Sequence, residues 1–177
     1  MKQQNVDLHE LVEQQNNKMK NEAKTITFGI IGAGRIGKLH ADNLLSRVEG
    51  ARLKAITDPF LDEEWTASKN IPVTGKDHRI MLNDPEIDAI LIGSPSAEHA
   101  PQLVECAQAG KHIFCEKPIA LDPIIIRNAL AEVDKSGIKL QVGFNRRFDP
   151  NFSAVQQQVA SGALGDPHII RITSRDP

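Results

Sequence analysis

A glycine-rich loop between an apolar segment and a helical pattern constrains the fold of this chain more than any other feature. Residues 26–31 have the apolar character of a buried strand, and the loop Gly32-Ala33-Gly34-Arg35-Ile36-Gly37 follows directly. From residue 36 to residue 48, apolar side chains recur at the spacing of one helix face. A strand, a glycine loop and a helix in this order predict the start of a doubly wound, dinucleotide-binding Rossmann domain.

Each glycine of the loop has a separate physical task in such a fold. Gly32 permits the tight turn after the strand, and Gly34 lets backbone N–H groups approach a pyrophosphate. Gly37 lets the helix pack closely against the strand. The free N–H groups at the helix start, together with the positive end of the helix dipole, favour an anion there. The glycine pattern alone is weak evidence, so the interpretation depends on the residues around it.

An acidic residue follows the next predicted strand. Asp58 comes about 20 residues after Gly37, at the end of the apolar segment 53–57. A carboxylate there can accept hydrogen bonds from both hydroxyls of an adenosine ribose and would repel a 2′-phosphate, which predicts NAD rather than NADP. Two alternatives stay open: Asp58 caps a turn before Pro59, or Arg35 contacts adenine or a phosphate.

From residue 25 onward, short apolar segments alternate with helical patterns. The predicted strands cover 26–31, 53–57, 72–73, 87–92, 112–115 and 140–144, and the predicted helices cover 36–48, 62–69, 97–109 and 123–135. This alternation is typical of right-handed crossovers between parallel strands. We therefore expect residues 25–145 to form a complete α/β domain with a doubly wound parallel sheet.

The two ends of the chain differ from this pattern. Residues 146–177 predict one helix at 151–160 and one alternating strand at 168–174, which together bury too little apolar surface to stand alone. We expect them to be the truncated start of an α+β C-terminal domain. Residues 1–24 are rich in Gln, Asn, Glu and Lys, which predicts a flexible N-terminal extension.

Composition excludes several classes of function. Hydrophobic residues make up 40% of the chain and charged residues 25%, with a net charge of −2, which favours a globular protein and disfavours nucleic acid as its partner. No segment approaches the roughly 18 consecutive apolar residues of a membrane span, and we expect no secretory signal. Cys106 and Cys115 form no metal-binding pattern, so we expect two reduced thiols in a cytoplasmic protein without a metal site.

Polar clusters follow three of the predicted strands. They are Ser94-Pro95-Ser96-Ala97-Glu98-His99, Glu116-Lys117-Pro118 and Asn145-Arg146-Arg147-Phe148-Asp149. In open α/β sheets the ligand crevice lies outside the carboxyl ends of the strands. The three clusters therefore predict one site at that edge of the sheet.

Together with the glycine loop, these clusters resemble the Gfo/Idh/MocA family of NAD(P)-dependent sugar and polyol dehydrogenases. The likeness covers residues 25–177 and rests on the segments 32–40, 109–120 and 143–152. Residues 143–152 and 170–177 are most similar to the myo-inositol 2-dehydrogenase branch, which oxidises myo-inositol to 2-keto-myo-inositol with NAD. The resemblance implies a homo-oligomer, a tetramer, for the full-length form. Alternatives are a dehydrogenase of another sugar or inositol isomer and a non-catalytic NAD-binding module.

The resemblance also implies roles for individual residues near the reacting groups. Lys117 is implied as the active-site lysine, whose ammonium hydrogen-bonds the reacting hydroxyl and stabilises alkoxide character. Pro118 fixes the backbone after it, and a cis peptide bond there would aim the lysine. Ser94, Pro95 and His99 are implied to lie along the nicotinamide side of the cofactor, although a histidine at a helix start is equally well explained as structural.

The resemblance implies further contacts with the cofactor and the substrate. Glu116 is expected among the cofactor contacts, and Arg147 and Asp176 among the substrate contacts. An alternative pairs Arg146 and Arg147 with Asp149 in a structural role. His40 is expected to be a packed residue behind the site.

The general base of the family is a histidine in an Asp-x-x-x-His segment of the second domain. His168 does not match that pattern, because Leu164 stands four residues before it. We therefore expect the segment to lie beyond Pro177. Since hydride transfer from an alcohol needs a nearby proton acceptor, Lys117 alone is expected to support little turnover.

Overall fold

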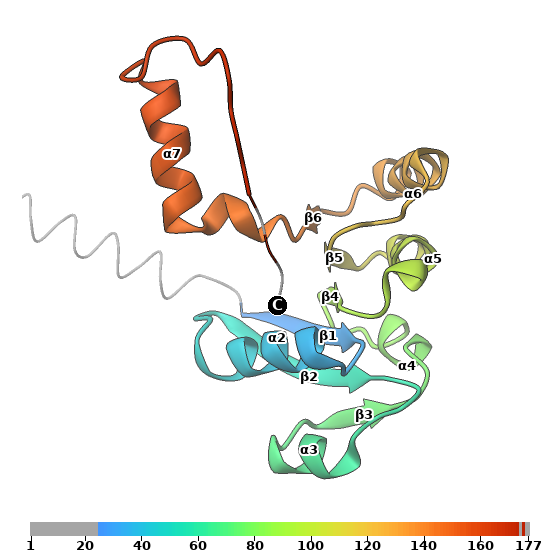
Figure 1. Ribbon diagram of the computed structural model, residues 1–177. Helices are drawn as coiled ribbons and strands as arrows, with labels where there is room; N and C mark the ends of the chain where they lie inside the picture. The colour runs from blue at the N-terminus through green and yellow to red at the C-terminus, as the bar shows by residue number, and fades with distance from the viewer. Residues whose placement is uncertain (1–24, 174, 176–177) are drawn as a thin grey trace, which may run out of the picture. The chain divides into compact units, whose positions relative to one another are not determined.

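The computed structural model describes residues 25–173 and residue 175 (Figure 1). These residues divide into two compact units, one ending at Val142 and the other beginning at Gly143. The predicted extension 1–24 and the substrate contact predicted at Asp176 lie outside the described residues.

The first unit is built on a six-stranded parallel sheet in the order β3-β2-β1-β4-β5-β6 (Figure 1). The strands are β1 (Ile26–Ile31), β2 (Ala51–Thr57), β3 (Val73–Gly75), β4 (Ala89–Ile92), β5 (His112–Cys115) and β6 (Leu140–Val142). The helices are α2 (Arg35–Ser46), α3 (Glu63–Ser68), α4 (Arg79–Leu82), α5 (Ser96–Gln108) and α6 (Pro123–Ser136). The strand order reverses direction between β1 and β4, which is the switch point where such sheets bind ligands.

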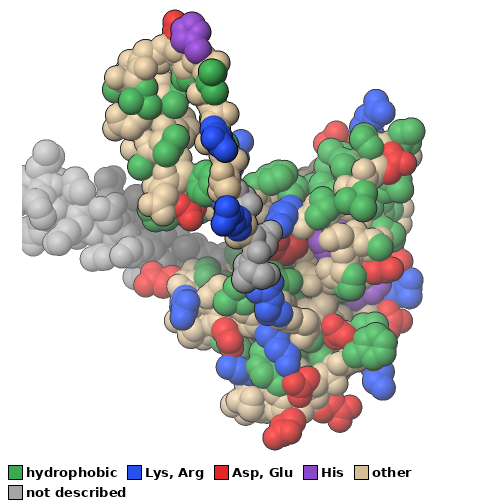
Figure 2. Space-filling model, in the orientation of Figure 1, with side chains coloured by type: hydrophobic (Ala, Val, Ile, Leu, Met, Phe, Trp, Pro, Cys, Tyr) green, Lys and Arg blue, Asp and Glu red, His purple; other side chains and the backbone are tan. Residues whose placement is uncertain are grey.

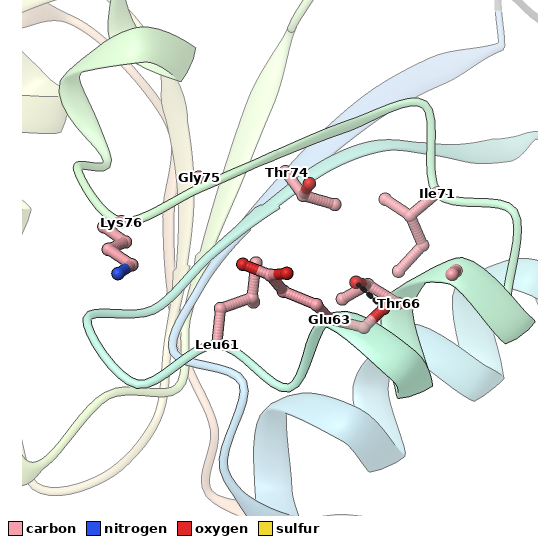
Figure 3. Close-up of a pocket in the computed structure, with 8 residues that line it drawn as sticks. Leu61, Glu63, Thr66, Ile71, Thr74, Gly75 and Lys76 are labelled. Carbon is pink, nitrogen blue, oxygen red and sulfur yellow. Dashed lines mark hydrogen bonds between the residues drawn. The ribbon is translucent and has the colours of Figure 1, made fainter.

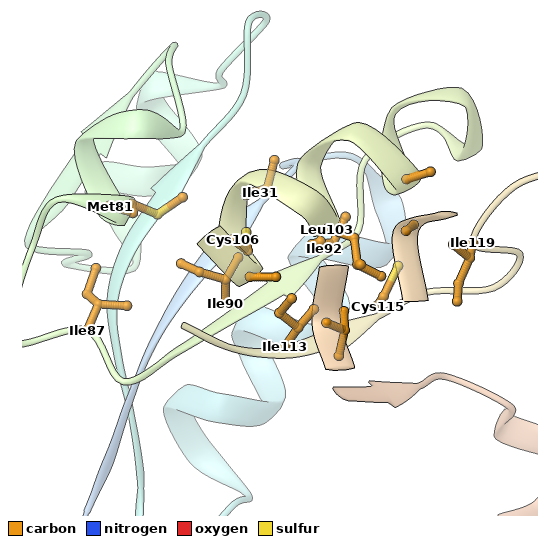
Figure 4. Packing of buried hydrophobic residues seen from close by; sticks show 14 of the residues in the cluster. Ile31, Met81, Ile87, Ile90, Ile92, Leu103, Cys106, Ile113, Cys115 and Ile119 are labelled. Carbon is orange, nitrogen blue, oxygen red and sulfur yellow. The ribbon is translucent and has the colours of Figure 1, made fainter. Parts of the chain in front are cut away.

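Alternation along the strands places the core on both faces of the sheet. In β1, Ile30 and Ile31 belong to two different clusters of buried side chains, because successive residues of a strand point to opposite faces. The smaller cluster includes Ala41 of α2, and the larger one includes Leu103 of α5 and Ala129 of α6. Figure 4 shows the larger cluster, in which Ile, Leu, Met and Cys side chains interdigitate. A sheet covered on both faces explains why its strands are nearly continuous apolar segments.

All strands and helices predicted for residues 25–142 are present, with shifted ends. No end is shifted by more than two residues. The predicted strand 72–73 corresponds to β3 at Val73–Gly75, so the following loop begins at Lys76. Helix α4 was not predicted, because four residues are too few to show a helical period.

The second unit holds a 3₁₀ helix, η1 (Asn145–Phe148), and the helix α7 (Pro150–Ala160). Asp149 begins α7, and its carboxylate accepts hydrogen bonds from the backbone N–H groups of Asn151 at 2.8 Å and Phe152 at 3.2 Å. None of the residues in these two helices is buried.

The strand predicted at residues 168–174 is not found in the described part of the chain. Residues 168–173 have no strand pairing in the structure, and residue 174 lies outside the described residues. The prediction was wrong for a physical reason: an alternating sequence becomes a strand only when a neighbouring strand takes up its backbone hydrogen bonds. The described part of the second unit contains no such strand.

Candidate functional site

Two glycines of the loop after β1 stand where no side chain fits. Gly32 has a φ of +97°, and a Cβ built on it would lie 2.6 Å from the backbone nitrogen of Ser94. A Cβ on Gly37 would overlap the carbonyl oxygen of Gly32. These two glycines therefore allow β1, the end of β4 and the first turn of α2 to approach one another closely.

Gly34 is different, because no atom lies within 4 Å of the position that its Cβ would occupy. It is the N-cap of α2, it has no side chain with which to cap the helix, and the first turn of α2 contains no acidic residue. The first N–H groups of α2 are thus left without a side-chain acceptor at the cap. Open space beside a helix N-terminus is the arrangement that binds phosphate oxygens.

Asp58 ties the end of β2 to this loop. One carboxylate oxygen accepts a hydrogen bond from the Ala33 N–H at 2.7 Å, and the other accepts one from the Phe60 N–H at 2.8 Å. The second contact is the turn-capping role that the sequence left open. Each carboxylate oxygen can accept more than one hydrogen bond, so these contacts leave acceptor capacity for a ribose hydroxyl.

A cavity of about 800 Å³ opens beside these residues. Its wall includes Asp58, the Gly93-Ser94-Pro95 segment after β4 and four residues of the glycine loop, namely Gly32, Gly34, Arg35 and Ile36. Glu98, from the polar cluster predicted after β4, lines it as well. Lining residues that the sequence did not assign to the site include Phe60, Lys76, Asp77, His78, Arg79 and Gln102. Lys76 to Arg79 follow β3 at the same edge of the sheet, so the rule that ligands bind at carboxyl ends could have found them had the end of β3 been predicted correctly.

A hydrogen bond and an ion pair, both to Glu105, hold part of this wall in place. The imidazole of His78 lies 2.7 Å from one carboxylate oxygen of Glu105, and the guanidinium of Arg79 lies 2.9 Å from the other. Burial alone would raise the pKa of Glu105, but the hydrogen bonds from His78 and Arg79 outweigh it and lower that pKa. On the face of the first unit that Figure 2 shows, cationic and anionic side chains are interspersed.

The residues predicted to lie on the nicotinamide side have different environments. Ser94 and Pro95 line the cavity, and the Ser94 hydroxyl donates a hydrogen bond to Oε1 of Gln102 at 2.6 Å. His99 is only 2% exposed. Its two ring nitrogens lie 2.8 Å from the carbonyl oxygens of Pro118 and Ser94.

The Glu116-Lys117-Pro118 segment continues directly from β5. Glu116 lies 2.9 Å from Nε2 of His40, and its other carboxylate oxygen accepts a hydrogen bond from the Lys117 N–H at 3.3 Å. His40 also packs edge-on against Phe114, with ring centroids 5.4 Å apart. Lys117 is exposed, and the Lys117–Pro118 peptide bond is cis.

Arg147 belongs to the second unit, where it is exposed in η1. The neighbouring Arg146 guanidinium lies over the ring of Phe152, 4.9 Å from its centroid. The Asp149 carboxylate caps α7, as described above. Among the residues that the structure describes, no group of three or more His, Cys, Asp or Glu side chains could hold a metal ion. In the same part of the chain, no helix is long and apolar enough to cross a membrane.

A smaller cavity of about 390 Å³ lies beside α3 and β3 (Figure 3). Figure 3 shows Ile71 and Thr66 on one side of it and Lys76 on the other. It shares Lys76 with the larger cavity but includes neither the glycine loop nor Asp58. We therefore assign the ligand site to the larger cavity.

The switch point, the glycine loop and the acidic residue after β2 define a dinucleotide-binding domain of the Rossmann class. Residues 26–144 match the Gfo/Idh/MocA oxidoreductase family, which is described by its NAD-binding Rossmann fold. The chain belongs to this family, and the resemblance inferred from its motifs is confirmed.

Individual relatives agree with the family. The chain is 51% identical over 156 residues to an uncharacterized oxidoreductase of Bacillus subtilis, YrbE, covering 87% of this chain and 46% of that protein. It is 41% identical over 152 residues to a myo-inositol 2-dehydrogenase of Thermotoga maritima, covering 85% of this chain and 45% of that protein. A crystal structure of scyllo-inositol dehydrogenase from Lactobacillus casei, with bound NAD(H) and scyllo-inositol, superposes with a TM-score of 0.75 at 38% identity and covers 81% of this chain and 43% of that one. The chain thus spans about half the length of these relatives.

Proposed function

We propose that this chain is the cofactor-binding half of an NAD-dependent inositol 2-dehydrogenase that oxidises myo-inositol to 2-keto-myo-inositol. The observation that carries the proposal is the open N-terminus of α2 at Gly34, beside an Asp58 carboxylate that is hydrogen-bonded to the same loop. Both border the cavity of about 800 Å³. Relatives named as myo-inositol and scyllo-inositol dehydrogenases support the polyol substrate.

The residues present fit the cofactor. Gly34 and the first N–H groups of α2 would hold the pyrophosphate, and Asp58 would accept hydrogen bonds from the adenosine ribose. Ser94 and Pro95, which line the cavity, would border the nicotinamide end. Glu116 is proposed as a further contact there, although it is not among the residues that line the cavity. When bound, NAD⁺ supplies the acceptor for the hydride that leaves the alcohol carbon.

Lys117 is the residue of this chain that we propose to act on the substrate. Its ammonium would donate a hydrogen bond to the alcohol oxygen and stabilise the negative charge that develops there. Arg147 and Asp176 are proposed to contact other hydroxyls of the polyol. The proton of the alcohol needs a separate acceptor, which the family resemblance assigns to an Asp-x-x-x-His segment of the second domain.

A second candidate substrate is favoured by one specific observation. The Lactobacillus casei structure named above, which has a similar fold, holds scyllo-inositol. Comparing myo-inositol with scyllo-inositol as substrates of the full-length form would separate the two isomers. A non-catalytic NAD-binding module would bind cofactor and oxidise neither.

The compartment and the assembly follow from the same proposal. A cytoplasmic location agrees with the two free, buried thiols of Cys106 and Cys115, because a reducing compartment keeps thiols in that form. A tetramer of the full-length form stays a prediction of the family resemblance.

The cofactor proposal is tested by titrating the 177-residue chain with NADH and NADPH in a calorimeter. We expect NADH to bind more tightly, because the Asp58 carboxylate repels a 2′-phosphate. Replacing Asp58 by Asn should reduce this preference. A preference for NADPH would overturn the role of Asp58, and failure to bind either nucleotide would overturn the proposed function.

The role of Lys117 is tested in the full-length form with the Lys117→Met substitution. Turnover of myo-inositol should fall by about 10²-fold or more, because a hydrogen bond to the reacting oxygen is lost in the transition state. NADH affinity should stay within about twofold, since the lysine is not proposed to hold the cofactor. Turnover close to that of the unsubstituted enzyme would contradict the assignment.

A further inference from the structure

The two hydrogen-bond partners of His99 favour a ring that is protonated on both nitrogens. The ring is buried in α5, with Nδ1 2.8 Å from the carbonyl oxygen of Pro118 and Nε2 2.8 Å from that of Ser94. Carbonyl oxygens only accept hydrogen bonds, whereas a neutral imidazole has one N–H and one bare nitrogen. A neutral ring would therefore turn one nitrogen lone pair toward a carbonyl oxygen without water between them. The imidazolium has two N–H groups and donates to both oxygens.

The two carbonyl groups belong to loops that the sheet itself no longer joins. The β4–β5 ladder pairs Ile92 with Cys115, and the Glu116 N–H donates to the Ile92 carbonyl at 2.9 Å. The β4–β5 ladder ends at this point, before Ser94 on one side and Pro118 on the other. The His99 side chain contacts both loops, so it connects them where the backbone hydrogen bonds of the β4–β5 ladder have ended.

The bridge connects a residue of the cavity wall to the segment that contains the proposed active-site lysine. Ser94 lines the cavity, and Pro118 directly follows Lys117. The nearby segments carry the charges of Glu98, Glu116 and Lys117.

The elements that pack against α5, the helix of His99, carry further charges. Helix α6, which packs on α5, carries Arg127, Glu132, Asp134 and Lys135, and Asp122 caps it. Strand β4 carries no charged side chain, and β5 carries only His112 at its far end.

We infer that His99 is a positioning residue, an imidazolium that donates to the carbonyl oxygens of Ser94 and Pro118. It thereby holds the Ser94-Pro95 segment, which lines the proposed nicotinamide side of the cavity, in place beside the segment that carries Lys117. The inference rests on the proposed function. It goes beyond that function because the buried His99 side chain would align the segments of the site without contacting a ligand.

The protonation state is tested directly on the unliganded chain. Ring-nitrogen NMR of ¹⁵N-labelled protein, with the His99 signals assigned by comparison with His99→Gln, should show both nitrogens protonated at neutral pH. A neutral single tautomer under those conditions would overturn the inference. This measurement involves no nucleotide, so it stands even if the proposed function fails.

The positioning role is tested by comparing NADH with ADP-ribose, which has the adenosine and pyrophosphate but no nicotinamide. We expect His99→Gln, which retains at most one of the two donated hydrogen bonds, to weaken NADH binding by about tenfold and to leave ADP-ribose binding within about twofold. His112→Gln, at the opposite end of β5, is the matched control and should change neither affinity. Equal losses for both ligands would mean that His99 merely supports the fold, and would overturn the inference.

A third measurement needs no substitution and covers the case in which His99→Gln does not fold. In the unsubstituted chain, NADH affinity should fall with rising pH over the range in which NMR reports loss of the His99 ring proton. ADP-ribose affinity should not follow that change. Parallel behaviour of the two ligands would overturn the positioning role. Failure of the unsubstituted chain to bind either ligand would instead overturn the proposed function on which it rests.

Discussion

At the scale of single residues, the glycines of the loop after β1 differ in what a side chain would meet. At Gly37 an added methyl group would overlap a backbone oxygen, and at Gly34 it would point into open space. Gly34 has a φ of −71° and a ψ of −172°, a backbone conformation open to any residue. The close packing of the fold therefore requires glycine at position 37, whereas glycine at position 34 leaves open space that a ligand can occupy.

We predict opposite effects for alanine at these two positions. Gly37→Ala should destabilise the chain by about 3 kcal/mol or more, because backbone atoms must shift to relieve the overlap. Gly34→Ala should leave the midpoint of thermal unfolding within about 2 °C and still weaken NADH binding by about tenfold, because the methyl group would occupy the space proposed for the pyrophosphate. Melting curves and calorimetry check both. Unchanged NADH affinity in Gly34→Ala would place the phosphates elsewhere.

The sequence left the roles of some single residues undecided. His99 could be interpreted from the sequence as structural or as facing the nicotinamide, because nothing in its neighbourhood reveals which carbonyl groups surround it. Asp58 had two alternatives as well, and the structure gives it a turn-capping contact with Phe60 in addition to a bond to the loop. The Asp58–Ala33 and His99–Pro118 contacts join residues that are distant in the chain, and only the fold brings them together.

At the scale of elements, prediction succeeded where a pattern was long or strongly apolar. Strand β4 and helix α6 were found because burial on both faces of the sheet and a full helical period leave clear signals. The helix α4 and the 3₁₀ helix η1 were missed because each is only four residues long. The strand predicted at 168–174 failed because its alternation says nothing about whether a partner strand exists.

The packing of α5 against β5 yields a prediction on the thiols. Cys106 and Cys115 are fully buried, and burial raises the pKa of each thiol to about 12. Only the thiolate reacts with disulfide reagents, so at pH 8 roughly one thiol in 10⁴ is reactive. We expect neither cysteine of the folded chain to react with Ellman's reagent within minutes, and both to react in denaturant. Rapid reaction of the native chain would contradict this packing.

The same pKa values determine a trend of stability with pH. In the unfolded chain these thiols lose their protons near pH 9, whereas in the folded chain they keep them until about pH 12. Between these values the unfolded state binds fewer protons, so the contribution of the thiols is fully present below pH 9 and is lost as pH rises toward 12. Denaturant unfolding of the unsubstituted chain and of Cys106→Ala should show a shallower alkaline decline for the variant. Equal slopes would contradict the assignment.

At the scale of the whole molecule, the site and the second unit are separate features. All residues that line the cavity of about 800 Å³ lie between Ile31 and Gln102, within the unit that ends at Val142. The unit from Gly143 onward has no buried residue in either of its helices. The stability of the chain and its proposed cofactor binding should therefore reside in the first unit.

We predict that deleting residues 143–177 leaves NADH affinity within about twofold of that of the full chain, because no lining residue is removed. The thermal unfolding midpoint should change by only a few degrees, since the buried clusters are unaffected. Titration calorimetry and circular dichroism check these expectations. A loss of NADH binding in a truncated chain that still melts cooperatively would show that the second unit contributes to the cofactor site.

The sequence by itself determined the class of fold, the position of the glycine loop and the family, because these depend on local patterns such as apolar segments, helical period and glycine spacing. Only the tertiary structure placed Lys76 to Arg79 beside Asp58 and enclosed His99 between two carbonyl groups. It also decided that residues 168–173 form no strand. The physical reason is the same in each case. Hydrogen bonding and burial depend on partners that are remote in the chain. A local sequence pattern does not predict how far away those partners lie or in which direction.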